Sequence, residues 1–321
     1  MLDAIWYKKS PLRWGLWPLA ALFGLISGGR RWLYRTGCRH AYRSPLPVIV
    51  VGNLSVGGNG KTPVVIWLVE YLRQQGWRPA VVSRGYGGKA AHYPLCLAQT
   101  TTTAEGGDEP VLIMRRCQCP VVVSPKRAEA VRLLEQRGDV DIIITDDGLQ
   151  HYALARDIEL VVVDGARRFG NGCLLPMGPL REPLSRLATV SAVICNGGEA
   201  QAGEHAMQLM ADVPRRVIDD APLDHALGPQ VDALAGIGHP PRFFATLREL
   251  GYELVQAQGY PDHHPFDADE LRARFSERPL LMTEKDAVKC REFAAENWWY
   301  LPVRAELPEA FALTLNTLLK E

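Results

Sequence analysis

The segment from Ser55 to Thr62 has the residue types and spacing of a phosphate-binding loop. It follows an apolar run at 47–53, precedes a stretch with helical spacing, and departs from G-x-x-x-x-G-K-T only in its leading Ser55. Its glycines let backbone N–H groups turn toward phosphate oxygens, Lys61 reaches the β and γ phosphates, and Thr62 ligates Mg²⁺. The residues predicted to bind ATP are therefore Ser55, Val56, Gly57, Gly58, Asn59, Gly60, Lys61 and Thr62.

A phosphate loop also needs a carboxylate at the end of a neighbouring strand to hold the metal and its water shell. Asp146 and Asp147 end one apolar run, and Asp164 ends another. Paired acids followed by Gly148, Gln150 and His151 favour a polar site, whereas Asp164 precedes a glycine and is typical of a turn. We therefore expect Thr62, Asp146 and Asp147 to hold Mg²⁺.

The elements that must position these residues alternate between short apolar runs and amphipathic stretches. Such alternation predicts parallel strands joined by crossover helices. Expected strands are 47–53, 79–83, 120–124, 140–145, 158–164 and 191–195, and expected helices are 61–75, 108–116 and 125–137. A second alternating run predicts strands at 231–236, 252–258 and 279–283, with helices at 241–250, 267–275, 284–295 and 308–320. Between the two runs, 197–230 is predicted to be a linker.

The first 43 residues contain a single acid, Asp3, although the whole chain has net charge +0. Their basic residues flank an uncharged run at 14–29, which is shorter than the roughly 20 residues that span a bilayer. Basic and aromatic residues beside an apolar run are typical of the headgroup region of anionic membranes. A buried core helix is the alternative. A secretory signal is not expected, because no cleavage site follows the apolar run. Nucleic-acid binding is not expected either, because the apolar run would have no role in it. The basic residues are Lys8, Lys9, Arg13, Arg30, Arg31, Arg35, Arg39 and Arg43.

The 321 residues, with 47% hydrophobic and 22% charged composition, predict a globular protein of two domains. The 7 cysteines are scattered without a C-x-x-C pair, which is typical of reduced thiols. Cys117 and Cys119 have no second ligand pair at zinc-site spacing, so a helix end and a strand start are expected there.

Eight ordered motifs extend over nearly the whole chain. They are the N-terminal hydrophobic and basic segment, G-N-x-x-x-G-G-x-G-K-T-P at 52–63, SRGYGG at 83–88, GDEP at 107–110, TDDGLQH at 145–151, GPLREP at 178–183, PDHH at 261–264 and TEKDAVK at 283–289. With these motifs the chain resembles the tetraacyldisaccharide 4'-kinases, the lipid A 4'-kinases of Gram-negative bacteria. The usual phenylalanine after DDG is Leu149 here, an apolar exchange that should not matter.

The resemblance implies transfer of the ATP γ-phosphoryl group to the 4'-hydroxyl of a tetraacylated glucosamine disaccharide 1-phosphate. The reaction would occur at the cytoplasmic face of the bacterial inner membrane, with ATP and Mg²⁺ as cofactors. The partners implied are this lipid and an anionic membrane surface, with no nucleic acid and no obligate protein partner.

The resemblance also implies site residues. Asp108 and His263 fall on the family's dyad that activates the sugar hydroxyl, and act together with Lys61. Without the resemblance, Asp108 would be a helix N-cap, and His263 and His264 would be a loop cluster or metal ligands. The sequence assigns no role to Lys285 and Asp286. Residues expected to contact substrate or nucleotide are Arg84, Tyr86, Glu109, Arg127, Gln150, His151, Arg181 and Glu182.

The sequence thus predicts an α/β fold, with a P-loop parallel-sheet domain, a smaller C-terminal α/β domain and an N-terminal membrane-associated helix. The predicted boundaries are 1–43 for the membrane-associated segment, 44–215 for the kinase domain and 216–321 for the domain that closes over the active site. Two alternatives share the phosphate loop: a membrane-tethered P-loop ATPase switch, which would not need Asp108 and His263, and a cytosolic kinase for a small metabolite.

Overall fold

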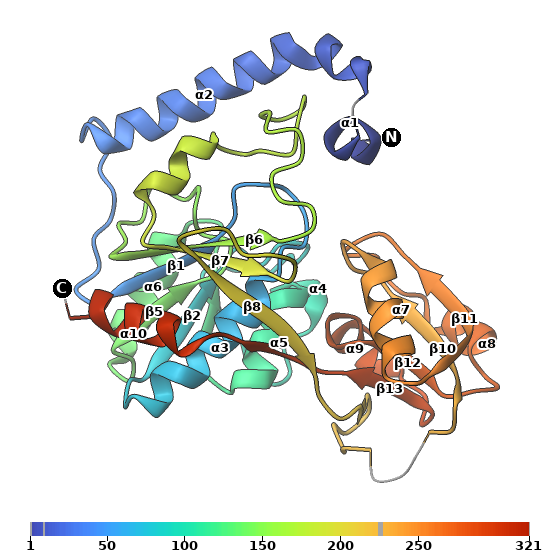
Figure 1. The fold of residues 1–321 in the computed structure, drawn as a ribbon. Helices are drawn as coiled ribbons and strands as arrows, with labels where there is room; N and C mark the ends of the chain where they lie inside the picture. Colours follow the sequence, from blue (N-terminus) through green and yellow to red (C-terminus); the bar gives the residue numbers. More distant parts are fainter. Residues whose placement is uncertain (1, 9, 224–226, 321) are drawn as a thin grey trace. The chain divides into compact units, whose positions relative to one another are not determined.

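The computed structural model of the protein describes residues 2–8, 10–223 and 227–320 (Figure 1). Lys9 of the basic segment and part of the predicted linker lie outside these residues. The chain forms two units, which do not follow the predicted linear boundaries. The first unit contains 1–84, 124–208 and 305–321, and the second contains 85–123 and 209–304.

The first unit is built on a parallel sheet whose strands lie in the order β8-β7-β6-β1-β5-β2. β1 and β2 are buried along their whole length, as expected for parallel strands covered on both faces. All but β8 confirm predicted strands. The bounds are β1 Val48–Gly52, β2 Pro79–Ser83, β5 Ile142–Thr145, β6 Ile158–Asp164, β7 Ala192–Asn196 and β8 Glu204–Ala211.

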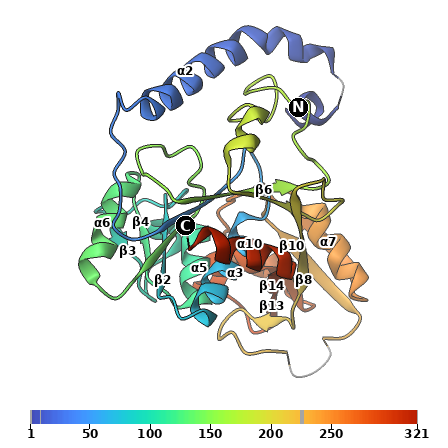
Figure 2. The same cartoon turned by 60° about the vertical axis from the view of Figure 1, so that its left-hand side comes forward.

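The helices of the first unit include α3 and α10, which lie beside each other in Figure 2. Phe311 of α10 is fully buried, with its ring centroid 5.4 Å from that of Trp67 in α3 and 5.1 Å from that of His205. The C-terminal helix is therefore part of the core of the unit that carries the phosphate loop. The bounds are α1 Leu2–Tyr7, α2 Trp17–Arg35, α3 Lys61–Gln74, α6 Arg127–Arg137 and α10 Glu309–Leu318.

The second unit contains a five-stranded sheet in the order β11-β10-β12-β13-β9, in which only the β13–β9 pair is antiparallel. The short strands β3 and β4 pair antiparallel elsewhere in this unit. Its strands are β3 Leu95–Cys96, β4 Val121–Val123, β9 Arg215–Arg216, β10 Gln230–Ala235, β11 Glu253–Gly259, β12 Leu280–Thr283 and β13 Trp298–Leu301, and β14 Val303–Glu306 runs from this unit into the first. Its helices are α4 Thr103–Gly106, α5 Asp108–Cys117, α7 Pro240–Glu249, α8 Ala268–Arg274 and α9 Glu284–Cys290.

The prediction of a linker over 197–230 was wrong, because β8 and β9 lie within it. Only Met207 of β8 is buried, and β9 spans just Arg215–Arg216, so neither strand has the apolar run by which the other strands were predicted. β13 and β14 were also missed, although Trp298–Leu301 is a buried apolar run like those that predicted the other strands.

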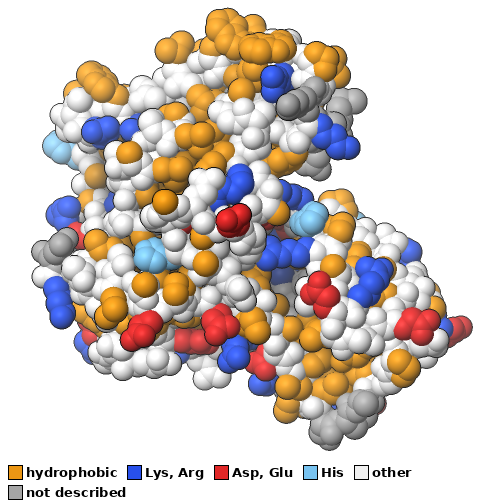
Figure 3. Space-filling view, viewed as in Figure 1, with side chains coloured by type: hydrophobic (Ala, Val, Ile, Leu, Met, Phe, Trp, Pro, Cys, Tyr) orange, Lys and Arg blue, Asp and Glu red, His pale blue; other side chains and the backbone are white. Residues whose placement is uncertain are grey.

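α2 carries an apolar surface that the first unit leaves exposed. Ala20 is its only buried residue, so the alternative of a core helix was wrong. Leu22, Leu25 and Ile26 are 54%, 74% and 65% exposed and share one face of the helix. Figure 3 shows hydrophobic side chains gathered over this helix. The helix ends at Arg35, so the basic residues Arg39 and Arg43 lie beyond it. Among the residues that the structure describes, no helix is long and apolar enough to cross a bilayer.

The burial of Phe311 predicts that Phe311→Ala lowers the free energy of unfolding by about 3–5 kcal/mol, the usual cost of removing a buried phenylalanine ring. Denaturant unfolding of the whole chain would measure the loss. Leu313→Ala, at a position that is 60% exposed on the same helix, is the matched control. Equal losses for the two variants would contradict a core role for α10.

Candidate active site

The phosphate loop joins β1 to α3 as the sequence predicts. Gly60 precedes the helix in the left-handed region at φ 88°, and a Cβ there would lie 2.3 Å from Asn196 Nδ2. Gly57 is also left-handed, at φ 116°. Both positions favour glycine, because other residues adopt positive φ only at a cost. The loop can therefore turn its backbone toward an anion at the start of α3.

A hydrogen bond explains why serine replaces the first glycine of the motif. The Asn59 side chain is 5% exposed, and its Nδ2 donates to Ser55 Oγ at 3.0 Å and to the Val162 carbonyl at 3.4 Å. Asn196 Nδ2 in turn donates to the Asn59 carbonyl at 3.1 Å. Ser55 thus supplies an acceptor that holds the loop from inside. Asn196 was missed from the sequence because it lies at the end of a strand without a motif of its own.

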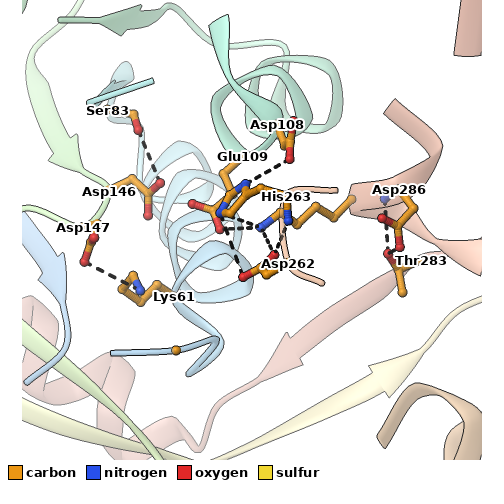
Figure 4. A network of polar contacts seen from close by, with 12 residues as sticks. Lys61, Ser83, Asp108, Glu109, Asp146, Asp147, Asp262, His263, Thr283 and Asp286 are labelled. Carbon is orange, nitrogen blue, oxygen red and sulfur yellow. Dashed lines mark hydrogen bonds and ion pairs between the residues drawn. The ribbon is translucent and has the colours of Figure 1, made fainter. Parts of the chain in front are cut away.

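Asp146 and Asp147 follow β5, which pairs with β1 and so brings them beside the loop (Figure 4). Lys61 Nζ lies 3.6 Å from Asp147 Oδ1, and Arg181 donates to Asp147 Oδ2 at 3.0 Å. Burial alone would raise the pKa of Asp147, but the charges of Lys61 and Arg181 outweigh it and lower that pKa. Asp146 is 1% exposed, and Ser83 Oγ donates to its carboxylate at 3.5 Å. Asp147 is therefore held as an anion beside Lys61.

The oxygen donors at this end of the sheet suit a hard cation. Thr62 offers a hydroxyl and Asp146 and Asp147 offer carboxylates, which are groups that Mg²⁺ prefers. Across 2–8, 10–223 and 227–320, no three His, Cys, Asp or Glu side chains are grouped to hold a metal by themselves. Mg²⁺ in kinase sites is commonly held by one or two carboxylates together with substrate phosphates and water, so the donor set fits it.

Asp164 forms the predicted turn. Its Oδ1 accepts hydrogen bonds from the backbone N–H groups of Ala166 and Arg167 at 3.0 and 2.8 Å. The carboxylate therefore stabilises this turn.

Several predicted contact residues support the phosphate-loop region from within the first unit. Arg127 is 3% exposed and donates to the Ser124 and Asp146 carbonyls at 3.1 and 3.4 Å. Burial lowers the pKa of Arg127 to about 10, so it remains charged at neutral pH. Gln150 donates to the Asn53 carbonyl at 3.0 Å, and His151 Nε2 accepts from the Arg127 backbone N–H at 3.3 Å.

Arg84 and Glu182 differ in their exposure. Arg84 follows β2 and is exposed. Glu182 is 4% exposed and accepts from the Tyr152 hydroxyl, while Arg186 lies 3.5 Å away, which favours a structural role. Burial raises the pKa of Glu182, and the hydrogen bond from Tyr152 opposes that rise.

A second group of polar residues lies wholly in the second unit. His263 Nδ1 is 3.0 Å from Asp108 Oδ2, which brings together the two residues that the sequence resemblance pairs. Asp108 does not cap its helix, because α5 begins at Asp108 and its N-cap is Gly107. Gly107 has φ 85°, and a Cβ there would lie 2.7 Å from the Tyr86 carbonyl. The Tyr86 ring centroid is 4.9 Å from that of His263.

Lys285 and Asp262 complete this group, and sequence reasoning gave neither a role. Lys285 Nζ lies 3.1 Å from Glu109 Oε1 and 2.9 Å from Asp262 Oδ1. His264, which neighbours His263, instead stacks on Tyr260 with ring centroids 4.7 Å apart. The signal that could have found Lys285 was its place in the TEKDAVK motif. Asp286 of the same motif is fully buried and accepts from Gly236 N and Thr283 Oγ1 at 2.8 and 2.6 Å, which is a structural use.

Comparison with known proteins decides the family. A family model described as tetraacyldisaccharide-1-P 4'-kinase matches residues 12–320. The chain belongs to the tetraacyldisaccharide 4'-kinase family. It is therefore a member of a family of kinases, and the resemblance predicted from its motifs is confirmed.

Relatives match this kinase over almost their whole length. It is 72% identical over 319 residues to a tetraacyldisaccharide 4'-kinase of Aeromonas hydrophila subsp. hydrophila, over 99% of this chain and 95% of that protein. It is 59% identical over 321 residues to one of Tolumonas auensis, over 100% of this chain and 98% of that protein. Its fold is similar to that of LpxK from Aquifex aeolicus, crystallised in complex with ATP, with a TM-score of 0.79, 28% identity and coverage of 96% and 98%. The predicted α/β fold class is confirmed.

His151 predicts how the stability of this kinase depends on pH. Burial, and next the charge of Arg127, lower the pKa of His151 from 6.5 to about 4. Between these values the unfolded chain binds more protons, so the free energy of unfolding should fall as pH is lowered through this window. His151→Asn should make that fall less steep in urea unfolding at a series of pH values. The exposed His40, changed to asparagine, is the control, and an unchanged slope in His151→Asn would refute the assignment.

Proposed function

We propose that this kinase transfers the γ-phosphoryl group of ATP to the 4'-hydroxyl of a tetraacylated glucosamine disaccharide 1-phosphate. The observation that carries the proposal is the contact between Asp108 and His263, at 3.0 Å, in a chain that also has a complete phosphate loop. A nucleotide switch needs the loop but has no use for a carboxylate paired with a histidine. The name of the family, tetraacyldisaccharide-1-P 4'-kinase, and those of its relatives support this acceptor.

ATP would bind with its phosphates on Ser55 to Thr62. The positive end of α3 and the backbone N–H groups of the loop favour the phosphate charge, and Lys61 adds its ammonium. The similar structure from Aquifex aeolicus is described as a complex with ATP, which supports this placement. Thr62, Asp146 and Asp147 would hold Mg²⁺, which supplies positive charge that stabilises the transferring phosphoryl group.

Asp108 would act as the general base for the sugar hydroxyl. As its carboxylate takes the hydroxyl proton, a bond forms between the sugar oxygen and the γ-phosphorus, and the bond to the β,γ-bridging oxygen breaks to leave ADP. His263 would orient Asp108 through their hydrogen bond. The loop belongs to the first unit and the dyad to the second.

The other residues predicted to contact substrate or nucleotide can be assigned from the groups near them. Tyr86 is exposed and its ring centroid lies 4.9 Å from that of His263, and Arg84 is exposed two residues before it, so we assign both to the phosphorylated sugar. Arg181 would serve the nucleotide through Asp147. Glu109 would act through Lys285.

We further propose that α2 rests on the cytoplasmic face of the inner membrane. Its exposed leucine and isoleucine side chains would enter the acyl boundary, and Arg30, Arg31 and Arg35 would meet anionic headgroups. This location suits an acceptor whose acyl chains are held in the bilayer.

The kinase proposal predicts a labelled bisphosphorylated lipid when γ-labelled ATP, Mg²⁺ and the tetraacyl acceptor are combined in detergent. Lys61→Ala should abolish the product, and Asp108→Ala should lower kcat by about 10²–10⁴-fold with ATP binding retained, since that is the usual contribution of general base catalysis. Asp269→Ala, at an exposed acid of the second unit, is the control. ATP hydrolysis without any lipid product would favour the switch, and near-normal turnover in Asp108→Ala would rule out the dyad.

The membrane proposal predicts that Leu25→Glu with Ile26→Glu weakens binding to phosphatidylethanolamine and phosphatidylglycerol vesicles by about a hundredfold or more, because each buried aliphatic side chain contributes roughly 1.5–3 kcal/mol. Vesicle sedimentation measures the change. Leu313→Glu, at an exposed leucine of α10, should bind like the unaltered protein. Equal binding by all three proteins would exclude α2 as the membrane contact.

A further inference from the structure

Lys285 is surrounded by acceptors that match its three protons. Its Nζ lies 2.9 Å from Asp262 Oδ1, 3.1 Å from Glu109 Oε1 and 3.4 Å from His263 Nε2, and its side chain is only 13% exposed. An ammonium has three N–H donors and no acceptor. Each of its donors therefore has one partner, and the third partner is the imidazole that also contacts Asp108.

This contact determines which nitrogen of His263 carries the proton. Because Lys285 can only donate, Nε2 must present its lone pair to it. The ring hydrogen then lies on Nδ1, where it is donated to Asp108 Oδ2 at 3.0 Å. The ring is thus neutral, and it serves Asp108 as a donor.

The surrounding charges keep Lys285 in its protonated form. Burial alone would lower the pKa of Lys285, but the charges of Glu109 and Asp262 outweigh it and raise that pKa. Burial alone would raise the pKa of Asp262, but the charge of Lys285 outweighs it and lowers that pKa. His263 is faced by Asp108 from α5, by Lys285 from α9, by Asp262 from its own loop and by the ring of Tyr86, while Glu109 reaches it through Lys285.

The helix that carries Lys285 is held by other contacts. Thr283 caps α9 by accepting from Asp286 N, Glu284 pairs with Arg116 at 3.0 Å, and Lys289 pairs with Asp286 at 2.8 Å. Lys285 is therefore not needed to anchor α9, and its ammonium is directed at the dyad instead.

We propose that Lys285 is a positioning residue that holds His263 as the neutral Nδ1–H tautomer, so that Asp108 remains the base for the sugar hydroxyl. The proposal rests on the dyad proposed above. Without Lys285, the ring would face the carboxylates of Asp108 and Asp262 with no cation beside Nε2, and these charges favour the imidazolium. An imidazolium would draw electron density from Asp108 and make it a weaker base.

The test is the pH profile of kcat for transfer to the tetraacyl acceptor. Lys285→Met should lower kcat by about tenfold to hundredfold at neutral pH, a fraction of what a general base contributes. The acidic limb of its profile should also move to higher pH, because protonation of the ring then removes activity. KM for ATP should change little. Lys285→Arg retains the charge and should restore the position of the limb.

Two controls establish whether the change in the profile is specific to Lys285. Lys126→Met removes an exposed lysine paired with Glu129, and its profile should match the unaltered protein. A profile that keeps its shape in Lys285→Met, whatever its height, would overturn the proposal. If Asp108→Ala were also fully active, the dyad itself would have failed, whereas an inactive Asp108→Ala beside an unaltered Lys285→Met profile would reject Lys285 alone.

The tautomer can also be measured in the unaltered protein, with one variant used only to assign the resonance. Histidine ¹⁵N labelling with two-bond proton correlation distinguishes Nδ1–H from Nε2–H rings. The resonance that disappears in His263→Asn should show a protonated Nδ1 and an unprotonated Nε2 at neutral pH. A protonated Nε2 would overturn the proposal.

Discussion

The parallel pairing of β1 with β5 and β6 is the constraint on which the nucleotide site depends. In register, Val50 lies opposite Thr145 and Gly52 opposite Val161, so the strands end at one edge of the sheet. The sheet thus delivers the phosphate loop and the two acids after β5 to the same edge, where Lys61 lies 3.6 Å from Asp147. β1 is buried on both faces, so its apolar side chains pack into the core on either side of the sheet.

Two lysines occupy contrasting electrostatic situations. Lys61 has a loose ion pair with Asp147 at 3.6 Å, in a position where an incoming phosphate can compete for its charge. Lys285 is bound by Glu109, Asp262 and His263 Nε2, so each of its three donors already has a partner. One ammonium is therefore suited to bind a substrate, and the other to fix the state of its neighbours. The phosphate-loop motif predicts the role of Lys61 from the sequence, whereas that of Lys285 depends on its side-chain contacts.

Much of the fold follows from local pattern. The apolar runs that became β1, β2, β5, β6 and β7 are short, continuous and bounded by turn residues, so periodicity and glycine placement suffice. The strands without such runs, β8 and β9, were missed because their pairing is set by neighbouring strands rather than by their own residues. The phosphate loop and the acids after β5 could be predicted for the same reason, because their motifs are local in the sequence. The Asp108–His263 pair joins distant segments, so only a family resemblance could pair them, and the contacts of Asn196 and Lys285 depend on side-chain geometry that no spacing encodes.

The discontinuity of the first unit has a consequence for how the protein is made. Residues 305–321 belong to the same unit as the phosphate loop, and Phe311 completes its core against Trp67 and His205. Residues 63–304 are therefore synthesised after the phosphate loop and before the segment that fills the core of its unit. During that interval the apolar surface of α3 is open to premature association. A chain that ended before residue 305 would have a nucleotide-binding unit with an unfilled core, although every residue of the phosphate loop is present.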